Sequence, residues 1–344
     1  MKKSTNKPIN IKKIAELTGV SVATVSRVIN KNGRYSKETE KRVLDVIRKS
    51  HYVPNMSAKG LRTSKTNVIG IVVPDITNPF FSTFVLNLQM NLFDKGYSCL
   101  ICNSNESSSL EEDQIQSLIS QNVDGIIIMS GTQAYSSLSS IPTIYVDRPV
   151  LDERPNCVSI ESDNELGGYL ATKELLDQGC KEIALLMWDS PISLSNQKTR
   201  YKGFQKAIKE NKKKVKTTKI VADSTNIFDG EKAVSQYLKK NKLPDGIVGL
   251  TDTLAIGACF ALNAIGKTVP DDIRITGYDN SYLAQTYRPA ITSVHQDTIK
   301  MAELAVENLL DLIDNKKLKT HHIKIPVELI QRGSTRKESY SSNK

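Results

Sequence analysis

From residue 68 onward, short apolar runs alternate with amphipathic segments, and this alternation restricts the fold more than any other feature of the chain. The first run, Val68–Val73, is continuously apolar, as expected for a parallel strand buried on both faces. A second series of the same kind begins at Ile183–Met187 and continues to Gly277. Two such series predict two doubly wound α/β lobes. Ligands of such sheets bind beyond the carboxyl ends of the strands, which predicts a cleft between the lobes.

A short basic module precedes these lobes. Residues 1–65 hold 16 of the 47 Lys and Arg residues but only 4 of the 37 Asp and Glu residues. Apolar residues at helical spacing, a stop at Gly19 and helix caps at Ser21 and Ser36 predict three short helices. Two helices across a tight turn form a helix-turn-helix unit, which places its second helix in the DNA major groove. The sequence therefore predicts a DNA partner for this module.

The second predicted helix, Val22–Ile29, carries candidate DNA contacts. Arg27 can form a fork with a guanine or clamp a phosphate, whereas Val22 and Ala23 offer apolar contacts to a thymine methyl group. A further helix is predicted over Met56–Arg62. It is barely two turns long, so we expect it to fold only on DNA and against a partner copy.

Polar and aromatic side chains follow several of the predicted strands. Carboxylates, guanidinium groups and amides suit a polyhydroxylated ligand, and aromatic rings cover the C–H face of a sugar. In chain order these candidates are Asn78, Phe80, Phe81, Asp147, Arg148, Arg200, Thr251, Asp252, Asp279 and Gln296.

Simpler explanations fit some of these residues. Asp147 and Arg148 also suit an ordinary surface ion pair, and Asp252 suits a helix cap. One of the two adjacent Phe rings suits the core. Trp188, at the end of a predicted strand, suits the cleft, its rim or the core equally well.

The sequence lacks the patterns of an enzyme or a metal protein. No G-x-G-x-x-G, G-x-x-x-x-G-K or G-x-S-x-G stretch occurs, and the four His residues have no metal-ligand spacing. The five Cys residues are an odd number, and no apolar segment follows the basic N-terminus as in a secretory signal. We therefore expect a cytoplasmic protein without enzymatic activity, cofactor or metal.

The stretch "IKKIAELTGVSVATVSRVIN" resembles the DNA-binding headpiece of the lac repressor family, and "YVPNMSAKGLRTSKT" resembles the hinge of that family. The resemblance continues to about Arg332. It implies a transcriptional repressor that binds a pseudo-palindromic operator as a homodimer, with Leu61 wedged into the minor groove. As an alternative, Leu61 is an ordinary linker residue. The implied DNA contacts are Ser21, Val22, Ala23, Thr24, Ser26, Arg27, Asn30, Asn55, Ala58, Lys59 and Leu61.

The motifs "TNPFF", "YVDRP", "TRYKGF", "GYDN" and "SVHQ" resemble periplasmic sugar-binding proteins, and most closely the ribose-operon repressors of the family. The resemblance implies a sugar effector, ribose or a related pentose. Thr251 departs from the family, which usually has Asn there; Thr is shorter and has a hydroxyl instead of an amide, which predicts a weaker contact. The implied effector contacts are Asn78, Phe80, Phe81, Asp147, Arg148, Arg200, Phe228, Thr251, Asp279 and Gln296.

The expected fold is therefore α plus α/β: a headpiece and hinge helix joined to a two-lobed, periplasmic-binding-protein-like core. The alternatives are a different sugar, a ligand that acts as corepressor, and a pentose-binding protein without DNA function. The expected segments are a headpiece (1–53), a hinge (54–65), a first lobe (66–160 and 292–322), a second lobe (161–291 and 323–333) and a disordered tail (334–344).

Overall fold

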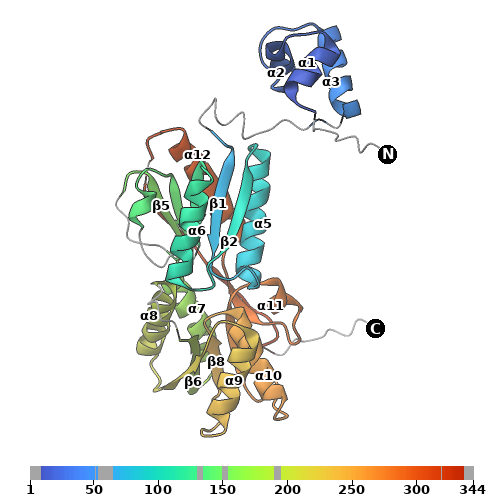
Figure 1. Ribbon diagram of the computed structural model, residues 1–344. Coiled ribbons are helices and arrows are strands. Elements are labelled where there is room, and N and C mark those ends of the chain that lie inside the picture. Colours follow the sequence, from blue (N-terminus) through green and yellow to red (C-terminus); the bar gives the residue numbers. More distant parts are fainter. Residues whose placement is uncertain are drawn as a thin grey trace. The chain divides into compact units, whose positions relative to one another are not determined.

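The computed structural model describes residues 9–50, 52, 65–129, 135–148, 154–189, 195–318 and 320–336 (Figure 1). The chain divides into two compact units, Met1–Thr66 and Asn67–Lys344. The predicted hinge contacts Asn55, Ala58, Lys59 and Leu61 lie outside the described residues.

The first unit is the predicted helix-turn-helix. Gly19 ends the first helix at a φ of 66°, and the Ser21 hydroxyl caps the second by accepting a hydrogen bond from the Thr24 backbone N–H. Ile14 and Val25 are completely buried in a small core between the helices. The helices are α1 (Ile11–Thr18), α2 (Val22–Ile29) and α3 (Lys37–Ser50).

The second unit begins with a six-stranded, all-parallel sheet in the order β11-β5-β4-β3-β1-β2. Helices α5 and α12 share an apolar core on one face of this sheet, and α6 packs near β1 and β2 (Figure 1). The elements of this lobe are β1 (Val68–Val73), α5 (Pro79–Asp94), β2 (Ser98–Asn103), α6 (Ser108–Ser120), β3 (Gly125–Ile128), the 3₁₀ turn η1 (Ser136–Leu138), β4 (Thr143–Val146), β5 (Cys157–Ser162), α12 (Thr298–Ile313) and β11 (His322–Ile325).

The other lobe contains the second sheet, in the order β12-β10-β9-β8-β6-β7, in which only β12 is antiparallel to its neighbour. Helices α7 and α8 pack against each other, as do α9 and α10. The elements are α7 (Asn164–Asp177), β6 (Glu182–Trp188), α8 (Ser195–Glu210), β7 (Lys216–Ala222), α9 (Ile227–Leu238), β8 (Gly246–Gly249), α10 (Asp252–Asn263), β9 (Arg274–Asp279), α11 (Tyr282–Thr286), β10 (Thr292–His295) and β12 (Glu328–Ile330).

The chain crosses between the lobes three times: from β5 to α7, from β10 to α12 and from β11 to β12. The predicted lobe boundaries are therefore corrected at two points. Strand β10, expected in the first lobe, pairs with β9 in the second sheet, with His295 opposite Asp279. Strand β11, which the predicted boundary divided, lies wholly in the first sheet.

The predicted start of the disordered tail is also wrong. Ser334 and Thr335 are buried, and the Ser334 hydroxyl donates a hydrogen bond of 2.6 Å to the Ile275 carbonyl. These contacts tie the end of the core to β9. Ordered core structure thus extends to at least Thr335.

Candidate functional site

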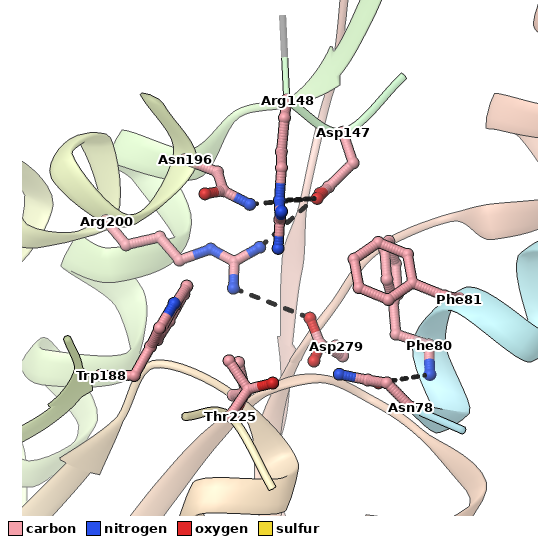
Figure 2. Close-up of a pocket in the computed structure, with 11 residues that line it drawn as sticks. Asn78, Phe80, Phe81, Asp147, Arg148, Trp188, Asn196, Arg200, Thr225 and Asp279 are labelled. Carbon is pink, nitrogen blue, oxygen red and sulfur yellow. Dashed lines mark hydrogen bonds and ion pairs between the residues drawn. The ribbon is translucent and has the colours of Figure 1, made fainter. Parts of the chain in front are cut away.

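The carboxyl ends of the strands from both sheets surround one pocket, which encloses about 280 Å³ of space, part of it open to solvent (Figure 2). The lining residues are Asn78, Phe80, Phe81, Asp147, Arg148, Trp188, Asn196, Arg200, Thr225, Thr251 and Asp279.

The first turn of α5 supplies the aromatic wall. The Asn78 side chain caps this helix by accepting a hydrogen bond of 3.0 Å from the Phe80 backbone N–H. The Phe80 and Phe81 rings meet edge to face at 5.2 Å, and both line the pocket. Phe84, one turn later, stacks on Phe80 and is completely buried in the core. Phe80 and Phe81 belong to the same buried cluster as Phe84 and also line the pocket, so packing in the core and a place in the pocket wall hold together for both rings.

Asp147 follows β4 and is almost completely buried. Its φ of 67° turns the chain sharply at the strand end. One carboxylate oxygen, Oδ2, accepts a 3.0 Å hydrogen bond from Asn196, and the other, Oδ1, has no hydrogen-bond partner among the described residues. Burial raises the pKa of Asp147, although Arg200 and Arg148 act in the opposite direction. An exposed surface pair with Arg148 is thus wrong, because Arg148 is equally buried.

Arg148 is held by a residue that sequence reasoning missed. Its two terminal nitrogens donate hydrogen bonds of 2.7 and 2.8 Å to the two carboxylate oxygens of Glu106. The Arg148 guanidinium carbon also lies 5.5 Å from the centre of the Phe81 ring. Burial opposes the charge of Arg148, but the hydrogen bonds and charge of Glu106 raise its pKa overall. Arg148 therefore carries a positive charge in the wall of the pocket.

Arg200, from α8, is anchored to the protein by two hydrogen bonds. Its Nε donates to the Asn164 side chain at 2.8 Å, and Nη1 donates to the Leu250 carbonyl at 2.7 Å. The guanidinium stacks 3.6 Å from the centre of the Tyr278 ring. It lies 3.9 Å from Asp147 and 3.8 Å from Asp279, so it bridges the carboxylates of the two lobes (Figure 2).

Two glycines allow α8 to carry Arg200 so close to α7. A Cβ atom on Gly168 would lie 2.0 Å from the Arg200 carbonyl oxygen, and one on Gly203 would lie 2.0 Å from that of Glu165. Only glycine permits this backbone contact. The α7–α8 contact therefore fixes the position of Arg200.

Asp279 ends β9, and Gln296 follows β10. The Gln296 amide nitrogen donates a 2.8 Å hydrogen bond to Asp279 Oδ1, while its Oε1 has no partner among the described residues. Burial raises the pKa of Asp279 well above its ordinary value, opposed by Arg200. Gln296 therefore acts beside the pocket, and its free oxygen is a buried acceptor.

Thr251, not Asp252, caps α10. The Thr251 hydroxyl accepts from the Leu254 backbone N–H at 3.2 Å and lies 2.9 Å from the Thr253 hydroxyl, which donates to the Thr225 carbonyl. The proton of Thr253 is thus committed, so Thr251 donates its own proton to Thr253. Thr251 can offer a ligand only an acceptor lone pair, unlike the amide of the usual Asn.

Asp252 lies behind the pocket. Its carboxylate accepts hydrogen bonds from the Ser281 backbone N–H at 2.7 Å and from the Ser293 hydroxyl at 2.6 Å. Burial raises its pKa to about 6, and these hydrogen bonds limit the rise. Asp252 therefore ties α10 to β10 and does not line the pocket.

Phe228 and Gln296 are the predicted effector contacts that are not among the lining residues, and Phe228 faces solvent. Its side chain is 77% exposed on α9. Thr225, just before that helix, lines the pocket instead, as does Asn196. Trp188, for which three locations were open, lies in the pocket wall across from Phe80 and Phe81 (Figure 2).

The predicted DNA-contacting residues of α2 remain available on the surface of the first unit. Ser21, Val22, Ala23 and Arg27 are exposed, and Thr24 and Ser26 are half-buried. Asn30 is partly committed, because its amide nitrogen donates to the Ser26 carbonyl at 2.7 Å. Its role as a DNA contact remains a prediction.

Within the described residues, no group of His, Cys, Asp and Glu side chains has the arrangement of a metal site. No helix of this part of the chain is long and apolar enough to cross a membrane. A helix-turn-helix unit joined to a two-lobed core with a polar pocket defines the class of ligand-binding DNA regulators.

Comparison with known proteins identifies the family. Residues 10–55 match the lacI family of bacterial regulatory proteins, and residues 172–335 match the periplasmic binding protein-like domain. The ribose operon repressor of Halalkalibacterium halodurans is 33% identical over 97% of this chain and 99% of its own. The HTH-type transcriptional repressor PurR of Histophilus somni is 32% identical over 95% of this chain and 98% of its own.

A solved structure is similar over nearly the whole chain. The lac repressor dimer bound to operator and the anti-inducer ONPF has a TM-score of 0.83 and 26% identity, covering 96% of this chain and 99% of that one. The chain belongs to the lacI family of bacterial regulatory proteins. It is a DNA-binding transcriptional repressor and not an enzyme.

Proposed function

We propose that this repressor binds ribose or a related pentose between its two lobes, and that the sugar controls its binding to operator DNA in the cytoplasm. The observation that carries this proposal is an aromatic wall opposite buried hydrogen-bond acceptors. Phe80 and Phe81 line the pocket together with Asp147, whose buried Oδ1 has no hydrogen-bond partner among the described residues. Gln296 Oε1, beside the pocket, is likewise buried without a hydrogen-bond partner among these residues. Sugar hydroxyls would satisfy these oxygens while the C–H face covers the rings.

One of the relatives supports the same effector. The relative from Halalkalibacterium halodurans is named a ribose operon repressor. The PurR relative has nearly the same identity, so a different effector class is the competing candidate. The proposed contacts are Asn78, Phe80, Phe81, Asp147, Arg148, Asn196, Arg200, Asp279 and Gln296.

We also propose that two copies bind a pseudo-palindromic operator together. Leu86, Met90 and Phe93 form an exposed apolar stripe on α5, with exposed fractions of 56%, 56% and 73%, and Ile101 on the edge strand β2 is 46% exposed. A second copy would cover this stripe. A two-fold symmetric protein matches a two-fold symmetric operator. On each copy, Ser21 to Arg27 would read the major groove and Leu61 the minor groove.

Sugar and DNA are then coupled through the core. Closure of the lobes around the sugar would move the ends of the first lobe and separate the paired hinge segments. The coupling is reciprocal, because the sugar weakens DNA binding by the same factor by which DNA weakens sugar binding. In the alternative response the sugar is a corepressor and strengthens DNA binding.

Two measurements test the proposal. Isothermal titration of the full chain with ribose, xylose, glucose and a purine base identifies the effector class; heat with the base alone would contradict the sugar assignment. A gel shift on a palindromic site, with and without ribose, tests the regulation. Operator affinity should also fall steeply with salt, because basic side chains displace counterions. A flat salt dependence would contradict the DNA-binding mode.

A further inference from the structure

Arg148, in the wall of the pocket, forms an ion pair with Glu106, and the proposed function gives this pair no role. Glu106 lies in the turn between β2 and α6, and 42 residues separate it from Arg148. Asn105 and Glu106 both have positive φ values, 50° and 58°, a conformation that is unfavourable for Glu. The strained turn brings the Glu106 carboxylate against Arg148, whose side chain is only 3% exposed. Both carboxylate oxygens are used, in the fork-to-fork geometry that phosphate or carboxylate ligands also adopt with arginine.

The other guanidinium of the pocket is also occupied. Nε and Nη1 of Arg200 are bonded to Asn164 and to the Leu250 carbonyl. Its remaining edge faces the carboxylates of Asp147 and Asp279. Arg200 is therefore anchored at Nε and Nη1, and an anionic ligand that approaches its remaining edge meets the carboxylates of Asp147 and Asp279.

The charged groups around the pocket also disfavour an anionic ligand. The lining residues contain two carboxylates, Asp147 and Asp279, and two guanidinium groups, Arg148 and Arg200. Glu106 adds a third carboxylate, so carboxyl groups outnumber guanidinium groups by three to two. A phosphate group entering this set meets more carboxyl than guanidinium groups, which makes its binding less favourable.

From these contacts we propose that Glu106 is a specificity-determining residue. By occupying the Arg148 fork, it makes the pocket accept uncharged sugars and reject phosphorylated ones. It also positions Arg148 beside the Phe81 ring, so that the guanidinium forms a fixed wall of the pocket. This inference rests on the proposed function, because it specifies the charge of the sugar that the site takes.

Replacing Glu106 by glutamine removes the charge of the side chain while nearly preserving its shape. Glu106→Gln keeps the side-chain length and one acceptor oxygen, but it removes the negative charge and frees one Arg148 nitrogen. The variant pocket has equal numbers of carboxyl and guanidinium groups, and one guanidinium is partly free. Binding of ribose should weaken about 10-fold, because one charge-assisted hydrogen bond that holds Arg148 is lost, and binding of ribose 5-phosphate should strengthen. Glu112→Gln, at an exposed position on α6, is the matched control.

Isothermal titration of the full chain with ribose, xylose, glucose and their phosphate esters provides the test. For the wild type, the uncharged sugar should bind at least 100-fold more tightly than its phosphate ester. The Glu106→Gln variant should reduce this ratio at least 10-fold, and the Glu112→Gln variant should keep it. Operator binding without sugar should be unchanged in both variants, which verifies folding.

The outcomes separate this inference from the proposed function. An unchanged ratio in Glu106→Gln, or a wild type that binds the ester as tightly as the sugar, overturns the role of Glu106. Binding of glucose but not of pentoses contradicts the proposed effector, while the ratio measured with glucose still tests Glu106. Binding of none of the uncharged sugars overturns both proposals.

Discussion

Replacing Arg200 by Met tests how the pocket is held together. Met preserves the length of the stem but removes the guanidinium, which bridges Asp147 and Asp279 and donates to Asn164 and the Leu250 carbonyl. Removing one member of a buried ion pair costs roughly 3–5 kcal/mol, because the other charge remains buried. For a unit of this size that corresponds to a decrease in melting temperature of about 10 °C at neutral pH.

The penalty should depend on pH. Burial already raises the pKa values of Asp147 and Asp279, and loss of the nearby Arg200 charge raises both further. A carboxyl group with a raised folded-state pKa contributes stability that is fully present below its unfolded pKa of about 4 and is lost as pH rises through the folded pKa. The difference between wild type and variant should therefore be larger at pH 7.5 than at pH 5.

Thermal unfolding followed by circular dichroism measures this difference at both pH values. Lys202→Met is the control, because Lys202 lies on the same helix with an exposed side chain. The reasoning would be refuted by a decrease of less than 3 °C at pH 7.5. An equal decrease at pH 5 and pH 7.5 would refute the assignment of the penalty to the two carboxyl groups.

Three other perturbations follow from the same structure. Phe81→Ala should abolish the ribose response in a gel shift and keep sugar-free operator binding, whereas Phe84→Ala should lower only thermal stability; loss of both activities in Phe81→Ala would indicate a core role. The pKa of about 6 for Asp252 predicts that roughly 3 kcal/mol of stability is lost between pH 4 and 6. Denaturant titrations of Asp252→Asn should lack this loss. Phe93→Asp should convert the dimer to a monomer in light scattering; an unchanged mass would exclude the α5 stripe.

Features that depend on local pattern could be predicted from the sequence. Asp147 and Asp279 follow apolar runs, and the rule that ligands bind beyond the carboxyl ends of parallel strands brings them together without any knowledge of packing. The helix-turn-helix is equally local, since Gly19 and Ser21 mark its turn. These features depend on neighbours in the chain.

Features that depend on the path of a loop or on pairing between distant segments could not be predicted from the sequence. Glu106 reaches Arg148 only because a turn with two positive φ values lies beside the end of β4. Phe228 was expected in the pocket because the resemblance to sugar-binding proteins implied it. Helix α9 begins at Ile227, and this start turns Phe228 toward solvent while Thr225 faces the pocket. Strand β10 carries no local sign of which sheet it joins.

Two of the three crossings between the lobes lie next to the pocket. Asn164 at the first crossing accepts a hydrogen bond from Arg200, and Gln296 at the second donates one to Asp279. A ligand in the pocket is therefore close to the axis about which one lobe would rotate relative to the other. Helix α5 starts at the pocket and extends about 24 Å for its 16 residues. A rotation of the first lobe by about 10° around the crossings would thus displace the far end of this helix by roughly 4 Å. Asn67, where the chain enters the core, lies at that far end beside Ser98.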